Sequence, residues 1–271
     1  MKIENLQATL SNRRGFTKAL SLASAGMAAF LAKVDSAEAA TITDADIVNF
    51  ALNLEYLEAE FYTVAVTGKT IDQFGIGING NGSQGATTGG GKVTFATGST
   101  LALSANEIME DEQEHVTLLR GALTALGLTP VAKPAINLNA LGTGFESQEA
   151  FITLARAFED VGVSAYGGAA PLIQNNAILA TAARILSVEA YHAGNLRLHA
   201  ALYQVPTKVL DSQDIVPPPS GSQFFTDNNQ GLSVVRAPGQ VLSIVYGGKP
   251  NVASGGFFPA GVNGAINTSS T

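Results

Sequence analysis

The chain contains no cysteine and only three histidines among its 271 residues. The absence of cysteine excludes disulfides, zinc ribbons and thiol chemistry, so a metal site would need carboxylate and imidazole ligands. Basic residues are also few: 15 Lys and Arg against 22 Asp and Glu give a formal net charge of -7, and no basic stripe suggests a nucleic-acid partner. With 46% apolar residues, the chain can still bury a full core, and one domain of about 200 residues with appendages is the simplest organisation.

A long apolar run is missing as well. The segment Ala19–Ala32 is short for a bilayer span and rich in Ala, Ser and Gly. It follows Arg13-Arg14 and precedes AEA at Ala37–Ala39, a small-residue cleavage site, so residues 1–39 resemble a twin-arginine export signal. An uncleaved amphipathic N-terminus or a membrane anchor is the alternative. The export interpretation predicts a periplasmic or extracellular protein with no stable membrane span after cleavage.

Four later segments predict long helices, because apolar residues recur in each at intervals of three and four. The first has Thr43 as its N-cap, and the second opens on a capping box formed by Ser104 and Glu107. The predicted bounds are Thr43 to Gly68, Ser104 to Gly127, Gln148 to Gly168 and Asn176 to about Tyr203. The expected fold is therefore all-α, with a four-helix bundle over residues 40–204.

Two irregular segments accompany the predicted bundle. The Gly-rich stretch GIGINGNGSQGATTGGGKVTF, between the first two helices, predicts a long surface loop with a short hairpin around Lys92–Phe95. Residues 205–271 predict a wrap over the bundle without chemistry of its own, with one short helix at PGQVLSIVYG. The aromatic side chains expected to be buried by this wrap are Phe224, Phe225, Phe257 and Phe258.

A Glu-x-x-His motif occurs twice, and in both copies an Arg follows the His by five residues. The first copy, EDEQEHVTLLR, contains Glu112 and His115, and the second, SVEAYHAGNLR, contains Glu189 and His192. Residues three apart lie on one face of an α-helix, so each pair can present two ligands in one direction. The two arginines, Arg120 and Arg197, fall off this face and predict salt bridges to neighbouring helices.

The other two helices carry a second repeat. Glu55 is followed seven residues later by Tyr62, and Glu159 by Tyr166, which places each Tyr two turns along the same stripe. If these helices are antiparallel neighbours, Tyr62 should bond Glu159 and Tyr166 should bond Glu55, since helical side chains lean towards the N-terminus. Ordinary core packing of both rings is the alternative.

Competing residues exist for some of these assignments. On the first helix, Glu58 and Glu60 compete with Glu55, which we favour because its spacing to Tyr62 matches that on the third helix. Glu58 would then be a supporting or spare carboxylate. His199 has no Glu three residues before it and is interpreted as an ordinary polar residue.

Four Glu and two His from four helices form the ligand set of ferritin-like di-iron and di-manganese proteins. The stretch Thr43–Ala201 resembles the ferritin-like superfamily, and LNLEYLEAEFY, EQEHVTLLR and VEAYHAGNLR are similar to its secreted, desiccation-related family. The resemblance implies two iron or manganese ions, with Glu112 and Glu189 bridging them and Tyr62 and Tyr166 supporting the ligands. The predicted ligands are Glu55, Glu112, His115, Glu159, Glu189 and His192.

Electrostatics favours the same ligand set. Four carboxylates in an apolar bundle would repel one another, so without cations their pKa values should be raised, whereas two divalent cations would balance them. The expected function is an exported di-metal protein that acts on oxygen, peroxide or ferrous iron in stress protection. The alternative is a non-catalytic metal-binding or structural desiccation protein. The sequence does not determine whether the protein forms a homo-oligomer. A storage cage is disfavoured, because the long loop and tail would be bulky on a packed shell.

Overall fold

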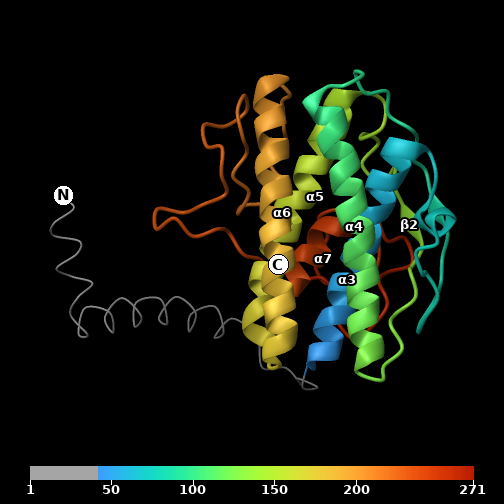
Figure 1. Cartoon of the computed structure of the whole chain (residues 1–271). Coiled ribbons are helices and arrows are strands. Elements are labelled where there is room, and N and C mark those ends of the chain that lie inside the picture. Colours follow the sequence, from blue (N-terminus) through green and yellow to red (C-terminus); the bar gives the residue numbers. More distant parts are fainter. Residues whose placement is uncertain (1–41) are drawn as a thin grey trace, which may run out of the picture. The chain divides into compact units, whose positions relative to one another are not determined.

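The computed structural model describes residues 42–271, so the export signal predicted for residues 1–39 lies outside the described part. Within residues 42–271 four long helices dominate, which confirms the all-α fold (Figure 1). They are α3 (Asp44–Thr67), α4 (Thr100–Ala125), α5 (Gln148–Ala169) and α6 (Asn176–Leu202). The shorter elements are η1 (Ile71–Phe74), β1 (Thr87–Thr88), β2 (Ile136–Asn137), η2 (Ala170–Leu172) and α7 (Pro238–Val245).

The helix ends follow local capping chemistry. Thr43 and Asp46 form a reciprocal capping box at the start of α3, and Gly68 ends this helix with a left-handed φ of 78°. The predicted start of α4 at Ser104 is wrong by about one turn. Ser99 is the N-cap, with its hydroxyl accepting from the amide of Ala102, while the Ser104 hydroxyl donates back to a backbone carbonyl one turn earlier.

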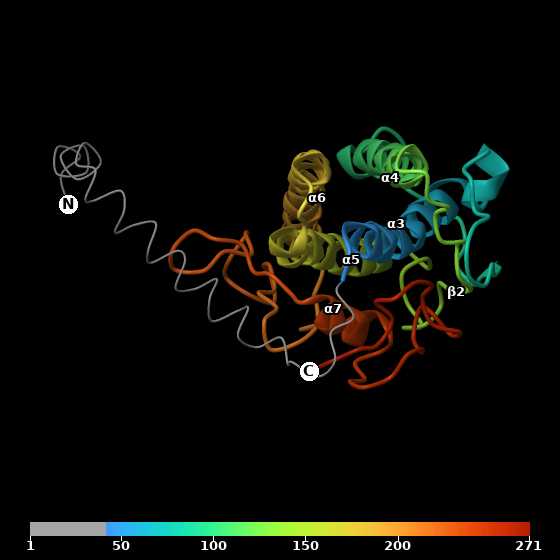
Figure 2. The same cartoon turned by 90° about the horizontal axis from the view of Figure 1, so that it is seen from below.

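The four helices are not equally buried. Viewed along the bundle, α3 and α5 lie between the α4 and α6 pair on one side and α7 with the C-terminal segment on the other (Figure 2). Accordingly, 17 of the 24 residues of α3 are buried, against 9 of the 26 residues of α4. Every residue from Leu52 to Ala65 on α3 is buried, so this helix carries carboxylates such as Glu55, Glu58 and Glu60 into the interior.

The long loop and the tail differ in part from expectation. No strand forms at Lys92–Phe95; instead β1 pairs in parallel with β2, and the Val93 amide donates to the Ala65 carbonyl at the end of α3. The tail forms the expected short helix, α7, and buries Phe257 and Phe258, as predicted.

The prediction for the other two tail aromatics is wrong, because Phe224 and Phe225 are 45% and 67% exposed. Their segment is held through its backbone: the Arg197 guanidinium donates to the carbonyls of Gln223 and Phe224. Backbone anchoring leaves the rings free to face solvent.

The two motif arginines behave differently. Arg197 on α6 lies 2.7 Å from the Asp160 carboxylate on α5, which confirms the predicted inter-helix salt bridge. Arg120 forms no ion pair within residues 42–271, so that prediction is wrong. Its guanidinium donates instead to the Tyr56 hydroxyl on α3 at 2.5 Å and to the Asn79 carbonyl.

None of the helices within residues 42–271 is long and apolar enough to cross a membrane.

Candidate metal centre

The six predicted ligand residues meet inside the bundle, and all six are buried. Their ligand atoms form two groups, and within each group one atom from every residue lies within 4.8 Å of the others. Glu112 and Glu189 belong to both groups, which is the arrangement needed for carboxylates that bridge two ions. The groups are Glu55, Glu112, His115 and Glu189, and Glu112, Glu159, Glu189 and His192.

Both histidines direct the same ring atom at the carboxylates. Nδ1 of His115 lies 3.3 Å from Glu55 Oε2, 3.3 Å from Glu112 Oε2 and 3.4 Å from Glu189 Oε1. Nδ1 of His192 lies 3.1 Å from Glu112 Oε1 and 3.3 Å from Glu159 Oε2. The two ring centroids are 6.4 Å apart, and the ring planes are tilted by 34° to each other.

The donor atoms at the centre fit two divalent cations. Buried polar atoms normally have a hydrogen-bond partner, and an unpaired one is costly. Several atoms at this centre have no such partner within residues 42–271, and cations coordinated there would satisfy them. They are Glu55 Oε2, Glu112 Oε1, Glu159 Oε2, both Glu189 carboxylate oxygens and His192 Nδ1. A mixed oxygen and imidazole set suits iron or manganese.

The pKa values of the carboxyl groups in the cluster agree in part with the prediction. Burial, together with neighbouring carboxylates, raises the pKa of Glu112 to about 7 and that of Glu189 well above its usual range, as predicted. The prediction is wrong for Glu55. Burial raises the pKa of this carboxyl, but the charge of the neighbouring His115 outweighs that effect and lowers it.

The same carboxylates raise the pKa values of the two histidines. Although burial favours the neutral imidazole, the Glu159 and Glu112 carboxylates raise the pKa of His192 to about 12. The pKa of His115 is raised as well, since Glu55 and the other carboxylates outweigh the burial of its ring. In the absence of a cation, the carboxylates around each ring therefore favour a proton on both imidazoles. Metal binding would displace these protons, because a ligating imidazole nitrogen must be deprotonated.

Two tyrosines hold the outer carboxylates. The Tyr62 hydroxyl donates to Glu159 Oε1 at 2.5 Å, and the Tyr166 hydroxyl donates to Glu55 Oε1, so both expected cross-helix hydrogen bonds are present. Burial and the adjacent carboxylates raise both phenol pKa values well above their usual range, which keeps the hydroxyls protonated as donors. Each bond occupies Oε1 and leaves Oε2 of the same carboxylate directed at the centre.

Asp111 belongs to the site but was missed by the sequence analysis. Its Oδ2 lies 3.0 Å from Nε2 of His192, so the carboxylate fixes the ring with Nδ1 towards the other carboxylates. The signal was available in the sequence, because Asp111 directly precedes Glu112. The second motif has Val188 at the matching position, so it offers no such partner to His115.

Gly162 was also missed. A Cβ atom at this position of α5 would lie 2.2 Å from Glu189 Oε2 and 3.3 Å from Glu58 Oε1. Glycine weakens a helix interior by roughly 0.5–1 kcal/mol relative to alanine, yet here it provides the room that the Glu189 carboxylate occupies. No sequence signal would have identified it, because the clash comes from a different helix.

The remaining candidates lie outside both ligand groups. Glu60 lies 3.3 Å from the Lys133 ammonium and accepts from the Ile71 amide, on the side towards the long loop. His199 belongs to neither group, but it is buried and its Nδ1 has no hydrogen-bond partner within residues 42–271, so it is not the satisfied polar residue expected. Burial lowers its pKa, and its ring packs against Tyr203.

The role of Gly162 leads to a prediction. Gly162→Ala should displace the Glu189 carboxylate and lower the metal bound in both groups, since Glu189 is shared by them. Gly194→Ala on α6 is the matched control, because nothing lies within 4 Å of a Cβ atom there. Metal content per chain measured by plasma mass spectrometry should fall only in the first variant. Equal metal content in the two variants would contradict the spatial role of Gly162.

A four-helix bundle with two carboxylate and histidine groups at its centre defines a ferritin-like protein. The family model for the ferritin-like domain matches residues 43–202, and the chain belongs to this family. The chain is also similar to the ferritin-like catalase Nec2 of Nesocodon mauritianus. The two sequences are 24% identical, and their alignment covers 82% of this chain and 84% of the relative.

Proposed function

We propose that the protein is exported, binds two iron or manganese ions and consumes peroxide in stress protection. The observation that carries this proposal is the pair of buried ligand groups that share Glu112 and Glu189. The activity named for the relative, a catalase, supports peroxide as the substrate over ferrous iron. Export is supported by the resemblance of residues 1–39 to a twin-arginine signal.

The proposed reaction converts two hydrogen peroxide molecules into two water molecules and one dioxygen molecule. Bound redox-active ions would supply the two-electron chemistry that this reaction needs. The residues of the chain would hold the ions and orient the ligands. Glu112 and Glu189 belong to both ligand groups, and Asp111 fixes the ring of His192. Tyr62 and Tyr166 fix the two outer carboxylates, which limits ligand movement during turnover.

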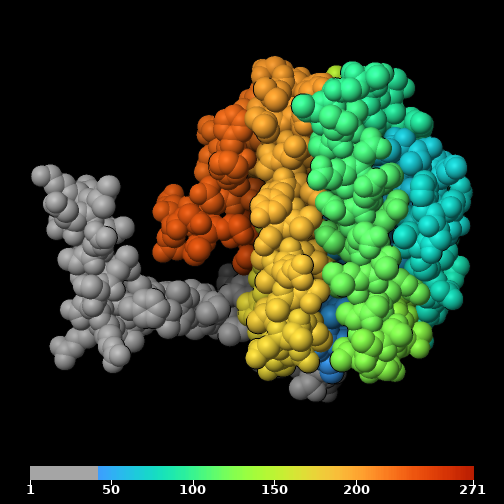
Figure 3. Space-filling model, viewed as in Figure 1, coloured from blue at the N-terminus to red at the C-terminus, as the bar shows by residue number. Residues whose placement is uncertain are grey.

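A polar depression supports access for a small polar substrate. It measures about 220 Å³ and lies between α4 and α6, which form a continuous surface side by side (Figure 3). His192 and Asp111 line it, together with the polar side chains of Ser104, Glu107 and Asn195. Hydrogen peroxide would therefore reach the edge of the centre without crossing the apolar core.

Metal analysis followed by activity assays tests the proposal. Protein purified without a tag should contain about two iron or manganese ions per chain, and it should release one dioxygen for every two peroxide molecules consumed. Bound metal without loss of peroxide would favour the non-catalytic alternative. Ferrous oxidation without peroxide consumption would replace the proposed activity with that of a ferroxidase.

A double variant of Tyr62 and Tyr166 tests their supporting role in the same assay. The Tyr62→Phe, Tyr166→Phe double variant should retain its metal but lose roughly tenfold or more in the rate of peroxide consumption, as when residues that orient metal ligands are removed. Tyr56→Phe is the control, because Tyr56 is a buried tyrosine on the same helix whose hydroxyl bonds Arg120 and the Val131 carbonyl. An unchanged rate in the double variant would refute the supporting role.

A further inference from the structure

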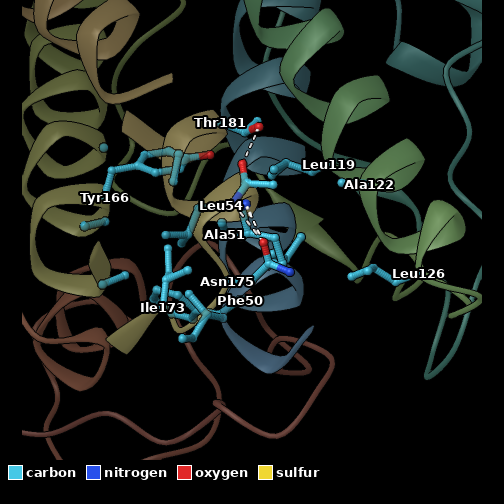
Figure 4. Close-up of a pocket in the computed structure, with 18 of the residues that line it drawn as sticks. Phe50, Ala51, Leu54, Leu119, Ala122, Leu126, Tyr166, Ile173, Asn175 and Thr181 are labelled. Atoms are coloured by element: carbon cyan, nitrogen blue, oxygen red, sulfur yellow. Dashed lines mark hydrogen bonds between the residues drawn. The ribbon is translucent and has the colours of Figure 1, made fainter. Parts of the chain in front are cut away.

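An apolar cavity of about 230 Å³ lies inside the bundle, at the end where α3 and α6 begin (Figure 4). All four long helices contribute to its walls, which include Val48, Leu54, Leu119, Ala165, Ile178 and Ala182. The cavity reaches the surface at Leu126 and Asn175, both of which are exposed. It is distinct from the polar depression between α4 and α6, since the two share no residue.

The inner end of the cavity meets the candidate metal centre. Gly162, Tyr166 and Glu58 line it there, and Glu189 lies directly behind Gly162. Glu58 is only 5% exposed, and no hydrogen bond to its carboxyl is found within residues 42–271. A buried carboxyl group without a hydrogen-bond partner, in the wall of an apolar cavity, can pair with a polar group of a bound molecule.

The size and lining of the cavity define the class of ligand. An apolar cavity of roughly 150 Å³ stays dry and can hold one benzene molecule, so by the same ratio this cavity can hold about nine carbon atoms. This is far more room than a passage for dioxygen needs. An unbranched chain fits a cavity that extends between helices from the surface to the Glu58 carboxyl at its inner end.

We propose that this cavity binds an unbranched aliphatic molecule of about six to nine carbons, whose terminal hydroxyl or hydroperoxyl group forms a hydrogen bond with the Glu58 carboxyl. The chain lies along the apolar walls, and the oxygen-bearing end lies next to Glu189. An alkyl hydroperoxide bound in this way has its O–O bond beside the metal centre, so the cavity extends the substrate class from hydrogen peroxide to organic hydroperoxides.

This extension of the substrate class rests on the proposed function. With hydrogen peroxide as the two-electron reductant, the reaction is ROOH + H₂O₂ → ROH + H₂O + O₂. The O–O bond of the hydroperoxide breaks, hydrogen peroxide is oxidised to dioxygen, and its two protons end on the alcohol and the water. Binding of the chain itself does not require turnover, so it can be tested separately.

Calorimetric titration of the full-length protein with 1-octanol tests the binding. One octanol should bind per chain, and octane, which lacks the oxygen, should bind roughly fivefold more weakly because one hydrogen bond is lost. Glu58→Leu should remove this difference between the two probes. Absence of octanol binding, or equal affinity for octanol and octane in the unaltered protein, would overturn the proposal.

Variants that fill the cavity test the same proposal, and a neighbouring position outside the cavity provides the control. Ala182→Leu should weaken octanol binding by about tenfold or more, because the added carbons occupy the space of the chain. Ala183→Leu, its exposed neighbour on α6 outside the lining, should bind octanol like the unaltered protein. If Ala182→Leu does not fold, Ala122→Leu fills the cavity from α4. Unchanged octanol binding in a folded filling variant would overturn the proposal.

The two proposals fail in different ways. Octanol binding in a protein that does not consume peroxide would support the cavity and remove the proposed function. Peroxide consumption in a protein that does not bind octanol would support the function and overturn the cavity proposal.

Discussion

His192→Ala is expected to remove one of the two proposed metal ions and to leave the helical bundle folded. His192 supplies the only nitrogen of its group, and the group around His115 does not contain it. Replacement of His192 by alanine leaves its group with three carboxylates and no nitrogen donor. The bundle should survive, since its helices are held mainly by packed apolar faces. His115→Ala is expected to have the same effect on the other ion.

Metal content per chain and far-UV circular dichroism together measure this result. His199→Ala is the matched control, because His199 is a buried histidine on the same helix as His192 and belongs to neither ligand group. It should retain both ions. Unchanged metal content in both ligand variants would refute the assignment, and loss of helical signal in either would show that the site, rather than apolar packing, stabilises the bundle.

Most of the candidate site could be predicted because helical geometry is local. Spacings of three and seven residues determine which side chains share a face, so the Glu-x-x-His pairs and the Glu and Tyr pairs could be placed before any helix packing was known. The cross-helix bonds from Tyr62 and Tyr166 needed one further assumption, that α3 and α5 are antiparallel neighbours. The spacing did not establish that arrangement, but the two hydrogen bonds found in the structure confirm it.

The features that were not predicted depend on contacts between segments distant in sequence. Gly162 matters only because a carboxylate from α6 approaches it, and β1 pairs with a strand 49 residues later in the register Thr87 to Ile136. The start of α4 was ambiguous for another reason, since Ser99 and Ser104 are both good N-cap residues. Local capping rules do not choose between them, and the structure places the N-cap at Ser99.

A buried network of charges links α5, α6 and the tail. Asp160 Oδ2 lies 2.7 Å from the Arg197 guanidinium and 3.2 Å from that of Arg156, and Arg156 also lies 2.9 Å from Asp214. Both arginine side chains are almost fully buried. Burial raises the pKa of Asp160 to about 6 even beside these two cations, so removing these charges from water is costly. The network is therefore sensitive to the loss of any one member.

Asp160→Ala is expected to lower the free energy of unfolding by about 3–5 kcal/mol, because it leaves the Arg197 charge buried without its carboxylate. Arg156 keeps Asp214, so the effect should be concentrated at Arg197 and at the segment around Phe224 whose backbone it anchors. Urea unfolding measures the loss, and limited proteolysis should show earlier cleavage near Phe224. Glu107→Ala, at an exposed position of α4 without an ion pair in the described residues, should change stability by less than about 0.5 kcal/mol. If Asp160→Ala lost as little stability as Glu107→Ala, the Arg197 charge would reach solvent once Asp160 is gone. The tail would then be held by the burial of Phe257 and Phe258 instead.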